Sequence, residues 1–228
     1  MFLSIIIPTL NEEKGIAKVI NSIPKEIKSQ AEIIVSDVST DSTPQIAEKL
    51  RARVIKMKEK GKGRQMREAV KQSKGEILIF MDGDATDPGE YIPKLIKKME
   101  ETNANIALAC RSGEDFKEDN KMAKRAYWLY AIFCLPLFWL IGMKVADPLA
   151  GFRAISRKDW DLLDLKSDYF EIESEMNVKA IKKNFIIREI HIPHMKRADG
   201  ITESKLFADP VMWLKIVWTV LKFFKAEK

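Results

Sequence analysis

Short apolar runs alternate with longer stretches of helical periodicity along the first half of the chain. Runs of strand length occupy residues 3–7, 33–35, 54–57, 77–81 and 106–110. Helix-like stretches lie around residues 16–23, 44–50, 64–73 and 91–101. This alternation is typical of βαβ units. It predicts an α/β fold in which a mostly parallel sheet is flanked by helices on both faces.

Polar residues follow three of these predicted strands at the point where each strand ends. The sequence PTLNE, residues 8–12, follows the first run, Asp37 follows the second, and Asp82-Gly83-Asp84 follows the fourth. The carboxyl ends of parallel strands lie at one edge of a sheet, where ligands bind. The sequence therefore predicts that these residues meet in one site.

The triplet Asp82-Gly83-Asp84 suits a hard divalent cation. Carboxylate oxygens are the protein ligands that Mg²⁺ and Mn²⁺ prefer, and Gly83 lets backbone and ligand approach closely. A cation held there would neutralise a diphosphate. The residues alone fit a capping turn equally well, in which Asp84 or Asp87 caps a helix that begins at Pro88.

The composition fits one large α/β domain with an anionic partner. The chain has 228 residues, of which 46% are hydrophobic, and 39 basic against 33 acidic residues give a net charge of +6. Nucleic acid is not expected as the partner, because no basic-aromatic binding motif is present. Cys110 and Cys134 lack disulfide or zinc spacing, which favours a reducing compartment. Residues 1–8 are interpreted as a buried strand and not as a signal peptide.

Eight short segments follow one another between Ser4 and Leu206. They are SIIIPTLNEE, IIVSDVSTDST, GKGRQMREAV, ILIFMDGDATD, ACRSG, DPLAGFRAISR, FEIESEMNVKA and IREIHIPHMKRADGITESKL. In this order and spacing they resemble the family 2 glycosyltransferases of GT-A fold. Within that family the chain looks most like dolichyl-phosphate mannose synthases and related polyprenyl-phosphate sugar transferases. The resemblance implies a Rossmann-like GT-A catalytic domain over residues 1–206.

The resemblance also implies roles for individual residues. The nucleotide sugar would be bordered by Pro8, Leu10, Asn11, Glu12, Asp37, Asp82, Gly83 and Arg111, with Asp37 at the base. Asp82 and Asp84 would hold Mg²⁺ or Mn²⁺ on the diphosphate. Arg111 and Arg197 would face phosphate or sugar, and Lys205 would hold the acceptor phosphate. The segment GKGRQMREAV would lie near the nucleotide.

Several of these assignments have alternatives on the sequence. Glu12 also fits a helix-starting acid, and Asp37 also fits a turn cap. Residues 36–38, SDV, stand where related enzymes often have two acids followed by glycine, so the base stays open. Thr86 stands where the synthases often carry glutamine. His191 and His194 are not assigned as metal ligands, because structural histidines are common.

Two apolar segments predict contact with a membrane surface. Residues 126–143 are uncharged with Pro136 inside, and residues 211–224 form a helix in which Lys215, Thr219 and Lys222 make one narrow polar stripe. A single crossing by residues 126–143 would separate Arg111 from the later site residues, so we expect interfacial helices, with 207–228 as an amphipathic anchor. The alternative for 126–143 is core or a dimer face.

The expected protein is therefore a monotopic enzyme at the cytoplasmic face of the cell membrane. It would move mannose or glucose from GDP-mannose or UDP-glucose to a polyprenyl phosphate, with the inversion that the family implies. One alternative is a family 2 enzyme with a sugar hydroxyl acceptor, for which Asp147 is the candidate general base. Another is a nucleotide-sensing membrane scaffold without turnover.

Overall fold

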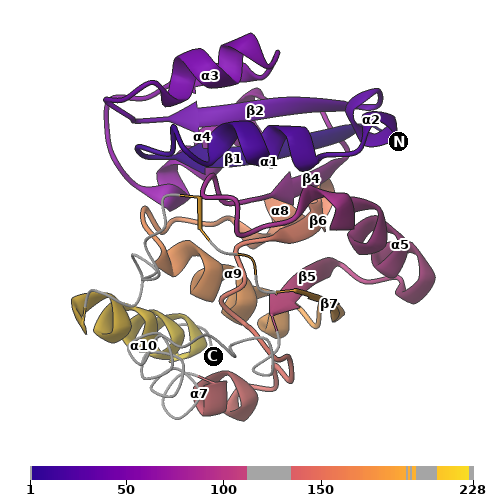
Figure 1. The fold of residues 1–228 in the computed structure, drawn as a ribbon. Helices are drawn as coiled ribbons and strands as arrows, with labels where there is room; N and C mark the ends of the chain where they lie inside the picture. Colours follow the sequence, from indigo (N-terminus) through magenta and orange to yellow (C-terminus); the bar gives the residue numbers. More distant parts are fainter. Residues whose placement is uncertain (1, 112–134, 194, 196, 199–209, 226–228) are drawn as a thin grey trace.

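The computed structural model describes residues 2–111, 135–193, 195, 197–198 and 210–225, and Figure 1 shows a central sheet with helices on both sides. Seven strands of this described part form one sheet in the order β3-β2-β1-β4-β6-β5-β7. They are β1 (Leu3–Thr9), β2 (Ala31–Asp37), β3 (Arg53–Lys56), β4 (Ile77–Phe80), β5 (Ile106–Arg111), β6 (Arg153–Ser156) and β7 (Ile187–Ile192).

The sheet is mostly parallel, as the sequence predicts. Strand β1 pairs in parallel with β2 and β4, β2 with β3, and β5 with β7. Strand β6 is antiparallel to both of its neighbours, β4 and β5. The carboxyl ends of β1, β2, β4 and β5 therefore lie at the same edge of the sheet, where the polar residues that follow β1, β2 and β4 are brought together.

Helices cover both faces of the sheet. They are α1 (Ile16–Ser22), α2 (Lys25–Lys28), α3 (Thr43–Lys49), α4 (Lys62–Gln72), α5 (Ile92–Thr102), α7 (Leu135–Leu140), α8 (Arg157–Leu163), α9 (Glu171–Lys182) and α10 (Pro210–Lys225), with a short 3₁₀ turn at Gly89–Tyr91. Helices α1, α2, α3 and α5 pack on one face, while α4, α8 and α9 pack on the other.

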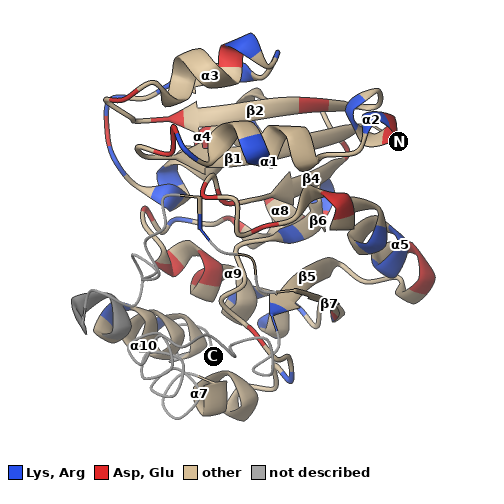
Figure 2. Ribbon diagram, viewed as in Figure 1, with Lys and Arg blue, Asp and Glu red and all other residues tan. Residues whose placement is uncertain are grey.

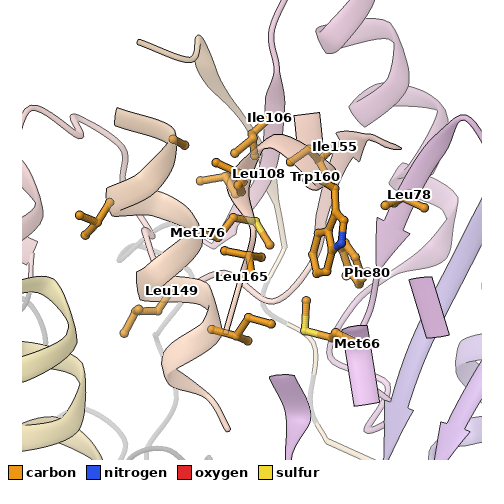
Figure 3. Close-up of a cluster of buried hydrophobic side chains, with 14 of the residues drawn as sticks. Met66, Leu78, Phe80, Ile106, Leu108, Leu149, Ile155, Trp160, Leu165 and Met176 are labelled. Carbon is orange, nitrogen blue, oxygen red and sulfur yellow. The ribbon is translucent and has the colours of Figure 1, made fainter. Parts of the chain in front are cut away.

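Each face of the sheet has its own apolar core. In β4, Leu78 and Phe80 belong to one buried cluster and Ile79 belongs to the other, as the period of two in a strand requires. Phe80 stacks on Trp160 of α8 with ring centroids 4.9 Å apart, inside the cluster that Figure 3 shows. These two cores fix the strand ends that carry the polar residues.

The two apolar segments are described in part. Residues 126–134 lie outside the described residues, and α7 covers part of the remainder. Helix α10 packs against α9 through Ile216 and Val220, and Thr219 of the predicted polar stripe is buried with them. No helix within the described ranges is both long enough and apolar enough to span a bilayer.

Candidate active site

Hydrogen bonds join the loops that follow β1 and β2. Asn11 adopts a left-handed conformation with φ of 56°, and its side-chain oxygen accepts from the Thr40 amide at 2.9 Å. The Asn11 amide donates to Ser39 Oγ at 2.8 Å, and the Glu12 amide donates to Thr43 Oγ1 at 2.8 Å. The loop after β1, which carries Asn11 and Glu12, is thus held by hydrogen bonds to the residues that follow β2.

Asp37 is buried at the end of β2. Its Oδ1 accepts from Thr9 Oγ1 at 2.7 Å and from Ser39 Oγ at 2.6 Å, and its Oδ2 accepts from the Ser39 amide at 3.1 Å. Gln65 of α4 donates through Nε2 to the carbonyls of Thr9 and Ser36, at 2.9 and 2.6 Å. Gln65 therefore ties the ends of β1 and β2 together, and the sequence analysis did not single it out.

The turn after β4 is packed closely against the loop after β1. A Cβ on Gly83 would lie 2.9 Å from Thr9 Cγ2 and 3.2 Å from Glu12 Cγ, so only glycine fits without displacing a neighbour. Asp84 Oδ1 accepts from the amide of Thr86 at 3.0 Å and from its hydroxyl at 2.7 Å. Thr86 therefore holds Asp84 in place.

Lys62 lies between two carboxylates. Its ammonium is 2.6 Å from Asp82 Oδ1 and 2.7 Å from Glu173 Oε1, and its side chain is only 10% exposed. Burial opposes the charged form, but the attraction of Asp82 and Glu173 raises the pKa of Lys62 above its usual value. Partial burial also opposes the charged form of Asp82, but the attraction of Lys62 holds the pKa of Asp82 below its usual value.

Arg197 lies against the second aspartate of the triplet. Its Nη1 is 2.6 Å from Asp84 Oδ2 and its Nη2 is 3.7 Å from Glu12 Oε1. The amide of Ala198 also donates to the backbone carbonyl of Asp84 at 3.0 Å. Residues 197–198, which follow β7 in the chain, therefore pack on the turn after β4.

Asp87 and Arg111 complete the charged cluster. Asp87 accepts from the Asp82 amide at 2.7 Å, and burial together with the negative charge of Asp82 raises the pKa of Asp87 to about 8. Arg111, at the end of β5, lies 3.6 Å from Asp147. Although burial opposes its charge, the carboxylates of Asp147, Asp87 and Asp82 raise the pKa of Arg111. Asp147 thus serves as a counter-ion to Arg111.

The cluster fits a cation that a substrate helps to hold. Within the described ranges, no group of three histidine, cysteine, aspartate or glutamate side chains is arranged to bind a metal ion by itself. Asp82 and Asp84 offer two carboxylates beside each other, and Asp82 Oδ2 accepts no hydrogen bond from the described part of the chain. Mg²⁺ is commonly held by one or two carboxylates together with substrate phosphates. The residues therefore fit a divalent cation that arrives with a diphosphate.

Most of the predicted site residues lie at one edge of the sheet, where Figure 2 shows acidic and basic segments on neighbouring loops. Pro8, Leu10, Asn11, Glu12, Asp37, Asp82, Gly83, Asp84, Arg111, Asp147 and Arg197 are all placed there or on the loops beside it. Lys205 and His194 lie outside the described residues, and His191 lies on β7. The sequence analysis missed Lys62 and Glu173 as members of the cluster.

Comparison with known proteins gives a family match and several relatives. The model of the family "Glycosyl transferase family 2" matches residues 4–163. The low-salt glycan biosynthesis hexosyltransferase Agl6 of Haloferax volcanii is 30% identical over 210 residues, which are 91% of this chain and 51% of that protein. The dolichyl-phosphate hexose transferase of the same organism is 29% identical, over 90% of this chain and 88% of that protein.

Two further comparisons bear on the fold and on chain length. The dolichol-phosphate mannosyltransferase of Pyrococcus furiosus is 26% identical over 98% of this chain and 64% of its own length. The chain thus spans about half of Agl6 and under two thirds of the Pyrococcus protein. Glucosyl-3-phosphoglycerate synthase from Mycobacterium tuberculosis, in complex with Mn²⁺, UDP and phosphoglyceric acid, superposes with a TM-score of 0.75. It is 22% identical over 100% of this chain and 80% of that one, which shows a shared fold.

Proposed function

Because the chain belongs to glycosyl transferase family 2, we propose that it transfers a hexose from a nucleotide diphosphate sugar to a polyprenyl phosphate of dolichyl type, with inversion. The observation that carries this proposal is the charged cluster at the sheet edge. The carboxylates of Asp82 and Asp84 meet three basic side chains, from Lys62, Arg111 and Arg197, while Asp87, with its pKa raised to about 8, keeps its proton at neutral pH. Two anionic substrates require such offsetting charge to be brought together.

The donor would lie across the ends of β1, β2 and β4. Asp37 and the loop with Asn11 would hold the nucleoside, while Asp82 and Asp84 would hold Mg²⁺ or Mn²⁺ against the diphosphate. A bound cation of this kind neutralises charge on the departing nucleoside diphosphate. Support comes from crystal structures of the Mycobacterium tuberculosis synthase in complex with Mn²⁺ or Mg²⁺ together with UDP or UDP-glucose. GDP-mannose and UDP-glucose are the proposed donors.

The acceptor is proposed to be a lipid phosphate because its oxygen arrives ionised. A phosphate monoester carries a charge of about −1.5 to −2 at neutral pH, so the protein must supply cations and not a base. Arg111 and Arg197 are proposed to do so, and Lys205, outside the described residues, is proposed to join them. The names of the Haloferax and Pyrococcus relatives support this acceptor. Asp147, the candidate base for a hydroxyl acceptor, is instead engaged with Arg111.

Contact with the membrane is proposed to run through α7 and α10. Large apolar side chains are exposed on both helices: Trp139 and Leu140 on α7, and Leu214, Trp218, Leu221 and Phe224 on α10. Both helices lie at the same end of the molecule in Figure 1. Exposed aromatic and aliphatic residues beside lysines are typical of a helix that lies in a bilayer surface. The protein is therefore proposed to be peripheral, at the cytoplasmic face, with residues 1–206 catalytic and 207–228 as the anchor.

Consumption of the donor separates the enzyme from a scaffold that only senses nucleotide. GDP-mannose and UDP-glucose, each labelled in the sugar, are to be incubated separately with the protein, polyprenyl phosphate and Mn²⁺. The enzyme is expected to release nucleoside diphosphate from one donor and to lose this activity in Asp84→Asn or in chelator. Donor binding without release of nucleoside diphosphate from either donor would support the scaffold instead.

A further inference from the structure

A cavity of about 250 Å³ lies between α10 and the N-terminal end of α9. Its polar lining consists of Lys166, Ser167, Glu171, Lys215, Thr219 and Lys222. None of these residues belongs to the charged cluster at the sheet edge. We propose that this cavity binds the phosphate-bearing headgroup of an anionic membrane lipid.

The cavity lining has one buried polar atom that the described part of the chain does not satisfy. Oε2 of Glu171 is buried and has no hydrogen-bond partner in the described part of the chain. Thr219, which also lines the cavity, is only 3% exposed. Buried polar atoms normally have partners, so Glu171 Oε2 is arranged for a ligand that supplies one.

The lysines set the charge of that ligand. Lys215 and Lys222 form no ion pair with any described carboxylate; instead they lie over aromatic rings, 5.3 Å from Tyr169 and 4.8 Å from Trp218 respectively. Lys166 pairs with the exposed Asp164 at 2.6 Å. Three lysines against the one glutamate of the lining favour an anion. A headgroup that also carries hydroxyls could donate to Glu171, as the glycerol of phosphatidylglycerol does.

The size and position of the cavity favour a lipid headgroup over a larger soluble ligand. Its volume is slightly below the roughly 300 Å³ at which pockets for drug-sized ligands begin. Trp218, which lines the cavity, is 60% exposed, and Leu214 and Leu221 of the same helix are also exposed. A lipid whose phosphate entered the cavity would therefore have apolar side chains beside its acyl chains. The inference rests on the proposed membrane contact of α10 and not on the transfer reaction.

Vesicle binding without any nucleotide sugar tests this inference separately from catalysis. The protein is to be floated with vesicles of phosphatidylcholine alone and of phosphatidylcholine mixed equally with phosphatidylglycerol. Each lysine near such a surface contributes about a 5-fold gain in partition, so Lys215→Met with Lys222→Met is expected to lose about 25-fold on the anionic vesicles. The matched control, Lys94→Met with Lys97→Met on the exposed side of α5, removes the same charge and is expected to keep wild-type partition.

A second variant distinguishes the cavity from diffuse attraction. Thr219→Leu fills the cavity without changing charge, and it is expected to weaken binding to anionic vesicles while leaving binding to neutral vesicles unchanged. Equal losses in both lysine pairs, or wild-type binding by Thr219→Leu with an unchanged thermal unfolding curve, would overturn the headgroup site. If inorganic phosphate without vesicles stabilised the protein against thermal unfolding in a saturable way, the cavity would be assigned to a soluble phosphate. That result would also overturn the headgroup site. Donor consumption by the same preparation reports on the transfer reaction independently.

Discussion

The guanidinium of Arg197 contacts the Asp84 carboxylate that a divalent cation would also bind. Replacing Arg197 by methionine is therefore expected to tighten cation binding. The 2.6 Å contact joins side chains that are only 12% and 10% exposed. A charge-assisted hydrogen bond with this shielding contributes about 1.5–3 kcal/mol. A cation that takes Asp84 must break this contact. In Arg197→Met the affinity for Mn²⁺ should therefore rise by about 10-fold to 150-fold in the absence of nucleotide.

Electron paramagnetic resonance of free aqueous Mn²⁺ measures this affinity directly, without turnover. Arg188→Met is the matched control, because Arg188 is an exposed arginine on β7 whose side chain, among the residues that the structure describes, donates only to the neighbouring carbonyl of Ile187. Thermal unfolding of each variant shows whether the fold is kept. An unchanged or weaker Mn²⁺ affinity in folded Arg197→Met would refute the idea that the guanidinium competes with the cation.

Three further predictions concern the same cluster. Lys62→Met is expected to lower the free energy of unfolding by about 3–5 kcal/mol, because it leaves two carboxylates uncompensated, and adding Glu173→Gln should recover part of this in urea titrations. Because the pKa of Asp87 is raised to about 8, the native protein keeps a proton that the unfolded chain releases above about pH 4. The contribution of Asp87 to the free energy of unfolding therefore falls as the pH rises from about 4 to about 8, by at most about 1.4 kcal/mol per pH unit. Asp87→Asn should flatten that slope in metal-free urea titrations, and equal slopes would contradict the assignment. Gly83→Ala should weaken binding of UDP or GDP in calorimetry, because its Cβ would lie 2.9 Å from Thr9 Cγ2. Wild-type affinity would show that the turn accommodates the Cβ without any effect on nucleotide binding.

The sequence predicted the first half of the fold well, because each element there has a regular pattern of its own. The runs at residues 3–7 and 77–81 correspond to β1 and β4, and the predicted α/β fold of GT-A type is confirmed. Strand β6 was not predicted, because four residues carry no detectable period and its antiparallel place between β4 and β5 depends on tertiary pairing. Helix α9 was not predicted as a helix either, since Glu173, Ser174, Glu175 and Asn177 are buried and mask its apolar face.

The carboxylates of the site, with Arg111 and Arg197, were predicted from the sequence, but the third internal cation, Lys62, was missed. Asp82 and Asp84 follow an obvious strand, so their place at the sheet edge could be inferred. Nothing in the sequence distinguishes Lys62 from a lysine at a solvated helix start, because its burial depends on Glu173, 111 positions away. Likewise, the pattern identified the polar stripe of α10, but only the packing on α9 shows that Thr219 faces inward and that its lysine neighbours line a cavity.

The comparison of a polyprenyl phosphate with the corresponding polyprenol tests the central claim most directly. Both lipids are to be offered under saturating labelled donor, and the label in the extracted lipid is to be counted. The account predicts label in the lipid with the phosphate and none with the alcohol, with Asp147→Asn retaining substantial activity and Lys205→Ala losing it. The claim would be contradicted if the label appeared in the alcohol, or in a sugar hydroxyl while the lipid phosphate stayed unlabelled, and if Asp147→Asn were folded but inactive.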